Sequence, residues 1–262
     1  MWKLNRLPYI TRLSQPFLSV QILWCAYMTA FVSRLKNVSR RFLNRPCILC
    51  SQSCGGPTAI CAACQKDLPW HQSGCLRCGL PLPNNVARCG GCLPKSLYFD
   101  RCLCAFNYQF PVNRLILSFK NNEKLVYGKA LSTLFAMHLK DYQPLPDMLM
   151  AMPIHWITRR RRGFNQSGLI AADLCRQLDL PLLHHACKKT RWTVPQKSLN
   201  SANRYKNVMN AFEVILDLNS LHIGLVDDVV TSMATTNSLS AELKKAGARE
   251  ITILCLARAS LP

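Results

Sequence analysis

The sequence predicts an α/β fold, in which a parallel sheet is flanked by helices and preceded by a small cysteine-rich module. From about residue 98, strand-like apolar runs alternate with helix-like patterns, and this alternation is typical of a parallel sheet with helical crossovers. Residues 47–95 are rich in Cys, Gly and Pro and poor in large aliphatic residues, so this segment cannot form a core without a staple. Apolar residues make up 49% of the 262 residues, a globular composition.

The individual elements follow in chain order. We expect strands at 101–108, 147–153, 221–226 and 250–257, and helices at 125–140, 165–178 and 236–247. Ile170, Leu174 and Leu178 are spaced four apart and fall on one helix face. A Thr or Asn cap begins the last helix and Gly247 ends it. The Leu and Met side chains of 131–137 are assigned to the core.

Composition divides the chain into three predicted parts: an N-terminal extension (1–46), the cysteine-rich module (47–95) and the α/β domain (96–262). The extension is basic and apolar, and no acidic residue precedes Asp67. Its apolar run at 17–31 is shorter than the roughly 20 residues that a membrane-spanning helix needs. We expect an interfacial amphipathic helix or an over-long translation start there, with membrane contact as the weaker alternative.

Eight of the fifteen cysteines form four Cys-x-x-Cys pairs, and both halves of the module have ten residues between their pairs. The pairs are Cys47/Cys50, Cys61/Cys64, Cys75/Cys78 and Cys89/Cys92. This spacing predicts two structural zinc ions, each held by four thiolates and without an open position for catalysis. Sequential and cross-braced pairings are both compatible with the spacing. Disulfides are the alternative, and we favour zinc and a cytoplasmic location because nothing else in the sequence indicates an oxidising compartment.

Two adjacent acids stand out in the stretch GLVDDVVTSMATTNSL (224–239). We expect a strand to end at Val226, which places Asp227 and Asp228 where ligands bind parallel sheets. The small and hydroxyl-bearing residues that follow lead into a helix N-terminus, which favours an anion such as phosphate. A sugar phosphate satisfies both features, because its hydroxyls face the acids and its phosphate faces the loop. A helix cap or a solvated loop is the plainer alternative.

The charge balance predicts a polyanionic partner. The formal net charge is +20, from 33 basic and 13 acidic residues, and such an excess favours nucleic acid, phosphorylated ligands or anionic lipid. Basic residues cluster at 34–45, 159–162 and 188–206, and single-stranded DNA is the expected partner. A merely soluble basic surface is the plainer reading.

Four motifs, in this order behind the cysteine-rich module, resemble the ComF family of competence proteins, which are similar to type I phosphoribosyltransferases. The motifs are FDRCLCAFNY, PIHWITRRRRGFNQS, TRWTVPQKSLNSANRYKNVMNAF and VDDVVTSMAT. The resemblance covers nearly all of the chain from Cys47 onward. It implies a type I phosphoribosyltransferase-like domain behind a double zinc ribbon, with phosphoribosyl pyrophosphate and Mg²⁺ as ligands.

The resemblance also implies roles for individual residues. Asp227 and Asp228 would bind the ribose hydroxyls, with Arg191 and Arg204 completing the catalytic set. The 5′-phosphate would be bound by Thr231, Ser232, Ala234 and Thr235. The pyrophosphate side would be formed by Arg160, Arg161, Asn165 and Gln166, and Gln196 would belong to a mobile loop at 191–204. The family usually has Gly where this chain has Met233, so we expect Met233 to adopt a negative φ and to turn its side chain away.

Three functions are compatible with these motifs. The first is an enzyme that transfers a phosphoribosyl group to an acceptor that the sequence does not name. The second is an accessory of DNA uptake and transformation that binds single-stranded DNA and contacts a helicase. The third is a regulator that senses a sugar phosphate without turnover. His155 is expected to pack or to cap a helix rather than to act as a base.

Overall fold

The computed structural model describes residues 45–121, 124–191 and 211–259. From Pro46 onward these residues belong to one compact unit. The expected N-terminal helix at 17–31, the basic cluster up to residue 44 and most of the expected mobile loop, including Gln196 and Arg204, lie outside the described residues. The predicted boundaries at residues 46 and 95 remain predictions.

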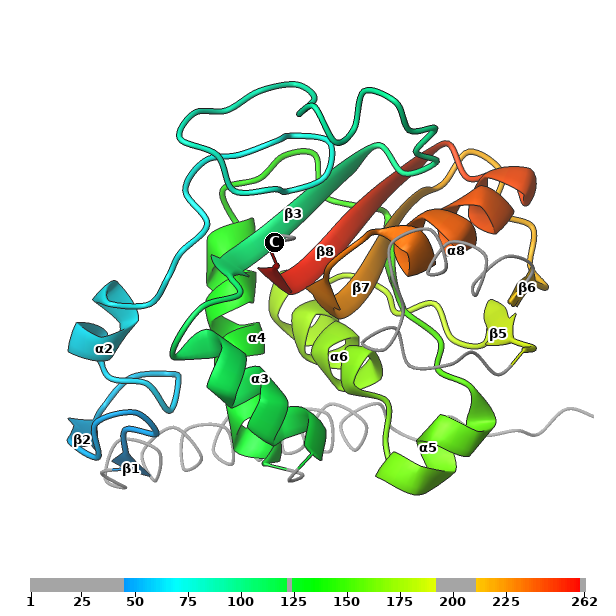
Figure 1. Cartoon of the computed structure of the whole chain (residues 1–262). Helices are drawn as coiled ribbons and strands as arrows, with labels where there is room; N and C mark the ends of the chain where they lie inside the picture. Colours follow the sequence, from blue (N-terminus) through cyan, green and yellow to red (C-terminus); the bar gives the residue numbers. More distant parts are fainter. Residues whose placement is uncertain (1–44, 122–123, 192–210, 260–262) are drawn as a thin grey trace, which may run out of the picture. The chain divides into compact units, whose positions relative to one another are not determined.

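The centre of this unit is a four-stranded parallel sheet with the order β3-β8-β7-β4 (Figure 1). Its strands are β3 (Arg101–Asn107), β4 (Met148–Ala151), β7 (His222–Val230) and β8 (Glu250–Arg258). The helices are α2 (Ala62–Lys66), α3 (Val112–Asn121), α4 (Leu125–Leu139), α5 (Trp156–Arg162), α6 (Gln166–Leu178) and α8 (Ala234–Lys245). Short strand pairs are formed by β1 (Arg45–Pro46) with β2 (Ser53–Cys54), and by β5 (Cys187–Lys189) with β6 (Phe212–Val214). The predicted fold class is confirmed.

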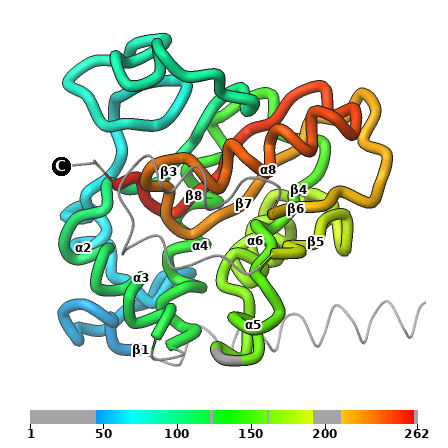
Figure 2. The backbone as a smooth tube through the Cα atoms, turned by 45° about the vertical axis from the view of Figure 1, so that its right-hand side comes forward, coloured from blue at the N-terminus to red at the C-terminus, as the bar shows by residue number. Residues whose placement is uncertain are grey.

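Each face of the sheet is covered by a different set of elements. One hydrophobic cluster joins Val226 and Leu254 of the sheet to buried residues of α3, α4 and α6. The other joins Ile223 and Ile253 to Leu239 of α8 and to the cysteines of the second half of the module. Figure 2 shows α8 and α6 on opposite sides of the strands. The continuous burial of β7 and β8 is what a parallel sheet covered on both faces requires.

Three details differ from the sequence predictions. Strand β7 continues to Val230 rather than ending at Val226, because the residues after the acids still pair with β8. The last helix begins after Met233, without a Thr or Asn cap and without a side-chain cap bond. Met137 is 47% exposed and is therefore not core, whereas Leu131, Leu134 and Phe135 are fully buried.

Among the described residues, no helix combines the length and the apolar character that crossing a membrane requires.

Candidate functional site

Asp227 and Asp228 lie in the C-terminal half of β7, at the carboxyl edge of the sheet. Asp227 is half-buried and pairs in register with Cys255, and Asp228 is 8% exposed. Successive strand residues point to opposite faces, so the two carboxylates have different surroundings. The expectation that the strand ends at Val226, before both acids, is wrong, because the strand continues past them to Val230.

Asp228 is paired with Lys120, which comes from the last turn of α3. The Lys120 Nζ lies 2.9 Å from Asp228 Oδ2. Burial of Lys120 favours its neutral form, but the charges of Asp228 and Asp227 outweigh this effect and raise the pKa of Lys120. The ammonium therefore stays charged and neutralises one of the two acids. No sequence motif identified Lys120, because three strands (β4, β5 and β6) separate α3 from β7 in the chain.

Among the residues that the structure describes, no cation forms an ion pair with Asp227. Its Oδ1 accepts hydrogen bonds from the Ser167 hydroxyl at 3.0 Å and from the Asp228 backbone N–H at 2.9 Å. Burial and then the charge of Asp228 raise the pKa of Asp227 to about 7, although Lys120 and the two hydrogen bonds oppose this. The Asp227 carboxyl, with a pKa of about 7, is therefore about half protonated at neutral pH, and a cation or a ligand hydroxyl can replace this proton.

The β5–β6 ribbon brings a second lysine toward the acids. Burial lowers the pKa of Lys189, and the negative charge of Asp227 opposes this shift. The Thr190 backbone N–H donates to the Ala211 carbonyl at 3.0 Å, so these two residues, on either side of the predicted loop, are neighbours. Of the predicted loop residues, Arg191 is exposed at this position, and Gln196 and Arg204 lie outside the described residues.

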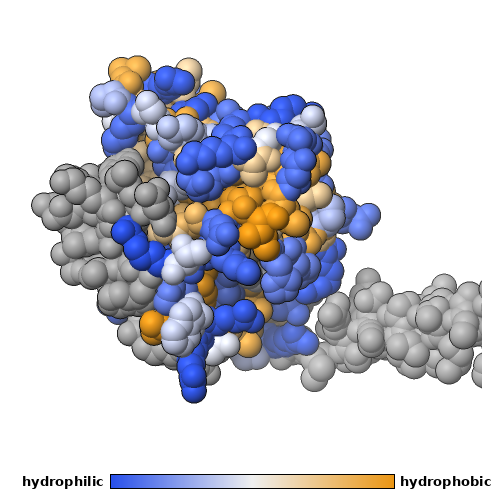
Figure 3. All heavy atoms as spheres, turned by 90° about the vertical axis from the view of Figure 1, so that its right-hand side faces the viewer, coloured by the Kyte–Doolittle hydropathy of each residue, from blue (hydrophilic) through white to orange (hydrophobic). Residues whose placement is uncertain are grey.

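Figure 3 shows the face of the molecule that carries β5 and β6, with an apolar area among polar side chains. Ile215 and Leu216, directly after β6, are 46% and 43% exposed. The predicted loop therefore starts from a surface that is partly apolar as well as basic.

The loop after β7 leads directly into α8, as expected for an anion site. Thr231, Ser232 and Met233 form a bend, and Ala234 and Thr235 begin the helix. Met233 has φ 66°, so the expectation of a negative φ is wrong. The backbone here has the conformation that glycine adopts most easily. The Met233 side chain is 6% exposed and packs in the core with Leu239, which is how the chain accommodates a larger residue.

The predicted pyrophosphate side is formed by α5 and the start of α6. Arg159 and Arg160 are exposed, and the structure gives no description of the Arg161 side chain. His155 caps α5 by accepting a hydrogen bond from the Ile157 backbone N–H, which confirms its expected role. Gly163 ends the helix in a left-handed conformation.

Asn165 and Gln166 lie where α6 begins, two residues and one residue before Ser167. Asn165 Nδ2 donates to the Met152 carbonyl at 3.1 Å, and Gln166 Oε1 accepts from Arg162 at 3.3 Å. Their other amide atoms, Asn165 Oδ1 and Gln166 Nε2, are buried without a partner among the described residues. Buried polar atoms are normally hydrogen-bonded, so these two atoms indicate a position where a ligand or water would bind.

The eight predicted metal ligands form two separate clusters. Cys47, Cys50, Cys61 and Cys64 come together, as do Cys75, Cys78, Cys89 and Cys92, with all Sγ atoms of a cluster within 4.8 Å. The sequential pairing is therefore confirmed. All described cysteines are free, and Cys54, Cys102 and Cys104 belong to neither cluster.

The Sγ–Sγ distances in the clusters fit zinc. They are 3.6 Å for Cys50–Cys61, 3.9 Å for Cys75–Cys92 and 3.7 Å for Cys78–Cys89. A tetrahedron with Zn–S bonds of about 2.3 Å has edges of about 3.8 Å. Two structural zinc ions are therefore consistent with the geometry.

In each half of the module, an equivalent backbone N–H group donates a hydrogen bond to one cysteine sulfur. Cys61 N donates to Cys47 Sγ at 3.3 Å, and Cys89 N donates to Cys75 Sγ at 3.2 Å. Burial alone would raise the pKa of Cys47 and Cys75, but backbone N–H groups lower these values to about 6 and about 7.

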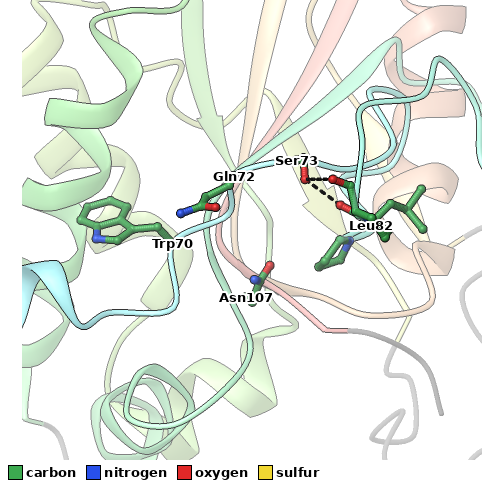
Figure 4. Close-up of a pocket in the computed structure, with 7 residues that line it drawn as sticks. Trp70, Gln72, Ser73, Leu82 and Asn107 are labelled. Atoms are coloured by element: carbon green, nitrogen blue, oxygen red, sulfur yellow. Dashed lines mark hydrogen bonds between the residues drawn. The ribbon is translucent and has the colours of Figure 1, made fainter.

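A cleft of about 290 Å³ lies elsewhere on the carboxyl edge of the sheet (Figure 4). It contains none of the predicted site residues and is lined by Trp70, Gln72, Ser73, Pro81, Leu82, Pro83 and Asn107. Trp70 packs against Phe106 and donates its indole N–H to the Gln65 carbonyl at 2.7 Å. We therefore assign Trp70 a structural role.

Three residues of the acid-pair site were missed by the sequence analysis: Lys120, Ser167 and Lys189. Ser167 was within the quoted GFNQS motif, and its place one residue after Gln166 was an available signal. Lys189 was within the basic segment 188–206 but was not singled out. Lys120 had no sequence signal, since its partner becomes evident only when the fold brings the end of α3 to Asp228.

The strand order and the two thiolate clusters define the class: an α/β protein with a parallel sheet, preceded by a double zinc ribbon. Residues 38–93 match the model of the double zinc ribbon domain. Competence protein F of Haemophilus influenzae is 31% identical over 227 residues, which cover 83% of this chain and 99% of that protein. The chain belongs to the family of Competence protein F and the DNA utilization protein YhgH. YhgH of Escherichia coli is 32% identical over 222 residues, covering 81% of this chain and 96% of that protein.

Two of the solved structures with a partial likeness are phosphoribosyltransferases. The purine phosphoribosyltransferase from Pyrococcus horikoshii is 24% identical, with a TM-score of 0.32, over 50% of this chain and 75% of that one. Adenine phosphoribosyltransferase from Leishmania tarentolae is 13% identical, with a TM-score of 0.35, over 52% of this chain and 73% of that one. At these scores the likeness carries no argument about function.

Proposed function

We propose that this protein binds phosphoribosyl pyrophosphate, with Mg²⁺, at the carboxyl edge of β7, in the course of DNA uptake or utilisation. One observation carries the proposal. Asp227 and Asp228 are followed within three residues by a bend of small and hydroxyl-bearing residues that leads into the N-terminus of α8. Acids suit ribose hydroxyls and Mg²⁺, and the helix N-terminus suits a phosphate.

The charges around the acid pair support a pyrophosphate rather than a neutral sugar. Lys120 is within 2.9 Å of Asp228, Lys189 interacts with Asp227, and the exposed Arg159 and Arg160 lie on α5. Cations around a pyrophosphate stabilise the charge that develops when it leaves.

In this proposal the chain's own residues have separate roles. Asp227 and Asp228 bind the ribose hydroxyls and orient the anomeric carbon. The phosphate loop (Thr231–Thr235) anchors the 5′-phosphate, with Thr231, Ser232, Ala234 and Thr235 as the donors. Arg160, Arg161, Asn165 and Gln166 face the pyrophosphate, and Arg191, Gln196 and Arg204 belong to the loop that excludes water.

Transfer would break the bond from the anomeric carbon to the pyrophosphate oxygen and form one to a nucleophilic acceptor atom. The electron pair of the broken bond leaves with the pyrophosphate, and the proton that the acceptor loses passes to solvent or to a basic side chain. Bound Mg²⁺ would supply additional positive charge for the leaving pyrophosphate.

Calorimetric titration with phosphoribosyl pyrophosphate tests the proposal, with and without Mg²⁺ and with ribose 5-phosphate as the comparison ligand. We expect saturable binding that Mg²⁺ strengthens and that exceeds the binding of ribose 5-phosphate. The absence of binding at millimolar ligand, or equal binding of both sugar phosphates, contradicts it.

Single-stranded DNA is the second candidate ligand, and α5 favours it. Trp156 and Ile157 are 64% and 43% exposed beside Arg159 and Arg160. An exposed aromatic side chain among arginines is the combination that binds bases and backbone without sequence preference. The printed names of the relatives, which refer to competence and DNA utilization, are consistent with this.

Salt dependence tests the DNA candidate. The double variant Arg159→Ala/Arg160→Ala should weaken binding of a homopolymer at low salt and reduce the salt slope by about 1.4, because each phosphate contact on a single strand contributes about 0.7. Lys129→Ala/Lys140→Ala removes the same charge from exposed positions of α4 and its end and is the matched control. Affinity that does not change with salt would exclude this mode.

A further inference from the structure

Arg258, the last residue of β8, is a buried arginine in contact with both the zinc ribbon and the phosphate loop. It is 2% exposed, and no ion pair in the described ranges includes it. Its Nε donates to the Cys78 carbonyl at 2.8 Å. Its Nη1 donates to the carbonyls of Val230 at 3.0 Å and Thr231 at 2.7 Å, and also to that of Ala259. One guanidinium therefore links a metal-ligand turn to the first residue of the loop.

A second link connects the same two parts. Asn237, in the first turn of α8, donates from Nδ2 to the Ser96 carbonyl at 3.0 Å and accepts from the Tyr98 backbone N–H at 2.7 Å. Residues 96–98 connect the second zinc cluster to β3. The helix that begins at the phosphate loop is thus tied to the segment that leaves the ribbon.

The two zinc clusters differ in what they pack against. Cys75, Cys78, Cys89 and Cys92 share a hydrophobic cluster with Val230 and Met233, which flank and belong to the loop. Cys47 of the first cluster packs instead with Phe135 and Leu139, on the α3–α4–α6 side. The two clusters are alike in spacing but only the second lies on the loop's side of the sheet.

The charge of the second zinc cluster also favours the buried position of Arg258. A buried guanidinium is costly unless its charge is compensated. Four thiolates around one Zn²⁺ leave a net charge of about −2 on the cluster, and this is the compensating charge that lies next to the Cys78 carbonyl. Without the metal the Cys78 turn would no longer be fixed, and Arg258 would lose its anchor on the ribbon.

We propose that the second zinc cluster, through Arg258 and Asn237, fixes the conformation of the phosphate loop, so that zinc in this cluster determines the affinity for a sugar phosphate. Arg258 is a positioning residue: it acts on the ligand through the Val230 and Thr231 carbonyls. The inference rests on the proposed function for its ligand, but the coupling between the cluster and the loop does not depend on it.

Two pairs of variants test the coupling. Arg258→Met should retain both zinc ions, increase amide hydrogen exchange at residues 231–237 by about tenfold, and weaken phosphoribosyl pyrophosphate binding about tenfold or more. Arg101→Met is its control, because Arg101 also donates to a carbonyl, that of Pro144 at 2.7 Å, but at the opposite edge of the sheet. It should leave loop exchange and affinity unchanged.

Cys89→Ser and Cys61→Ser form the second pair, since they occupy equivalent positions in the two halves. Both should lose one zinc ion, but only Cys89→Ser should increase exchange in the loop. If Arg258→Met does not fold, the comparison of Cys89→Ser with Cys61→Ser still tests whether the second zinc cluster is coupled to the phosphate loop. Equal loop exchange in Cys89→Ser and Cys61→Ser overturns the inference. Absence of phosphoribosyl pyrophosphate binding by the unmodified protein would refute the proposed function, whereas the exchange measurements would still test the coupling.

Discussion

The two acids of β7 should respond to amide substitution with opposite changes in stability. Burial and the charge of Asp228 raise the pKa of Asp227 from 3.8 to about 7 in the folded protein. Because the pKa of Asp227 is higher in the folded than in the unfolded protein, its contribution to the free energy of unfolding is most favourable below pH 3.8. This contribution falls as the pH rises from 3.8 toward 7. Asp227→Asn removes this loss while retaining the Oδ1 atom that accepts from Ser167 and from Asp228 N.

A difference of about three pKa units corresponds to about 4 kcal/mol at alkaline pH. Because Asp227 is half-buried, solvent screens part of this effect, and we expect Asp227→Asn to raise the free energy of unfolding by about 1–3 kcal/mol at pH 8. The gain should be smaller at pH 6, where the wild-type carboxyl is mostly protonated.

Asp228→Asn should lower the free energy of unfolding, because it removes the ion-pair partner of Lys120. The side chains are 23% exposed for Lys120 and 11% exposed for Asp228, so the pair is mostly desolvated. Leaving a buried ammonium unpaired costs several kcal/mol when burial is complete, and we expect a loss of about 1–3 kcal/mol here. Asp173→Asn, which breaks the pair with the exposed Arg176, is the control and should cost less than about 0.5 kcal/mol.

Urea unfolding of the three variants at pH 6 and pH 8, with zinc present, measures these differences. Equal destabilisation by Asp227→Asn and Asp228→Asn, or a loss of stability in Asp227→Asn at pH 8, would refute the assignment of separate surroundings to the two acids.

Three further predictions concern the metal, the loop and Lys120. The purified protein should contain two zinc ions per chain, and a chelator should unfold the ribbons; metal analysis that finds no zinc, or mass spectrometry that finds disulfides, would contradict this. Met233→Gly should remove the strain of φ 66°, about 1 kcal/mol, but lose a buried side chain worth about 2 kcal/mol. Its melting temperature should fall while phosphoribosyl pyrophosphate binding is preserved or improved, and abolished binding would make Met233 a contact residue. Lys120→Met should weaken that binding at least tenfold, whereas Lys129→Met, at an exposed position of α4, should not; equal affinities would exclude Lys120 from the site.

Local sequence patterns predicted most of the fold. The strands at 101–108 and 250–257 and the helices at 125–140 and 165–178 agree with β3, β8, α4 and α6 to within one or two residues at each end. Parallel strands buried on both faces have continuous apolar runs, and helices have a regular apolar stripe, so both are evident in one sequence. The zinc clusters were also predictable, because a Cys-x-x-Cys pair is a local unit with a fixed geometry.

Features that depend on contacts distant in the chain were not predictable in this way. Lys120, in the last turn of α3, pairs with Asp228 of β7, and Arg258 joins Cys78 to Thr231 across three segments of the chain. The φ of Met233 is set by the geometry of the β7–α8 turn, which overrides the residue's own preference, and its buried side chain compensates for the strain.

The most direct test of the central claim is a calorimetric titration of phosphoribosyl pyrophosphate with Mg²⁺ into the wild-type protein, Asp227→Asn and Asp173→Asn. If the acid pair binds the ribose hydroxyls or the cation, Asp227→Asn should weaken binding by about 1–3 kcal/mol even though it stabilises the fold. Asp173→Asn should bind as the wild type does. Affinity that is unchanged in Asp227→Asn, measured on a folded and zinc-loaded protein, would contradict the assignment of a sugar-phosphate site to β7 and the loop that follows it.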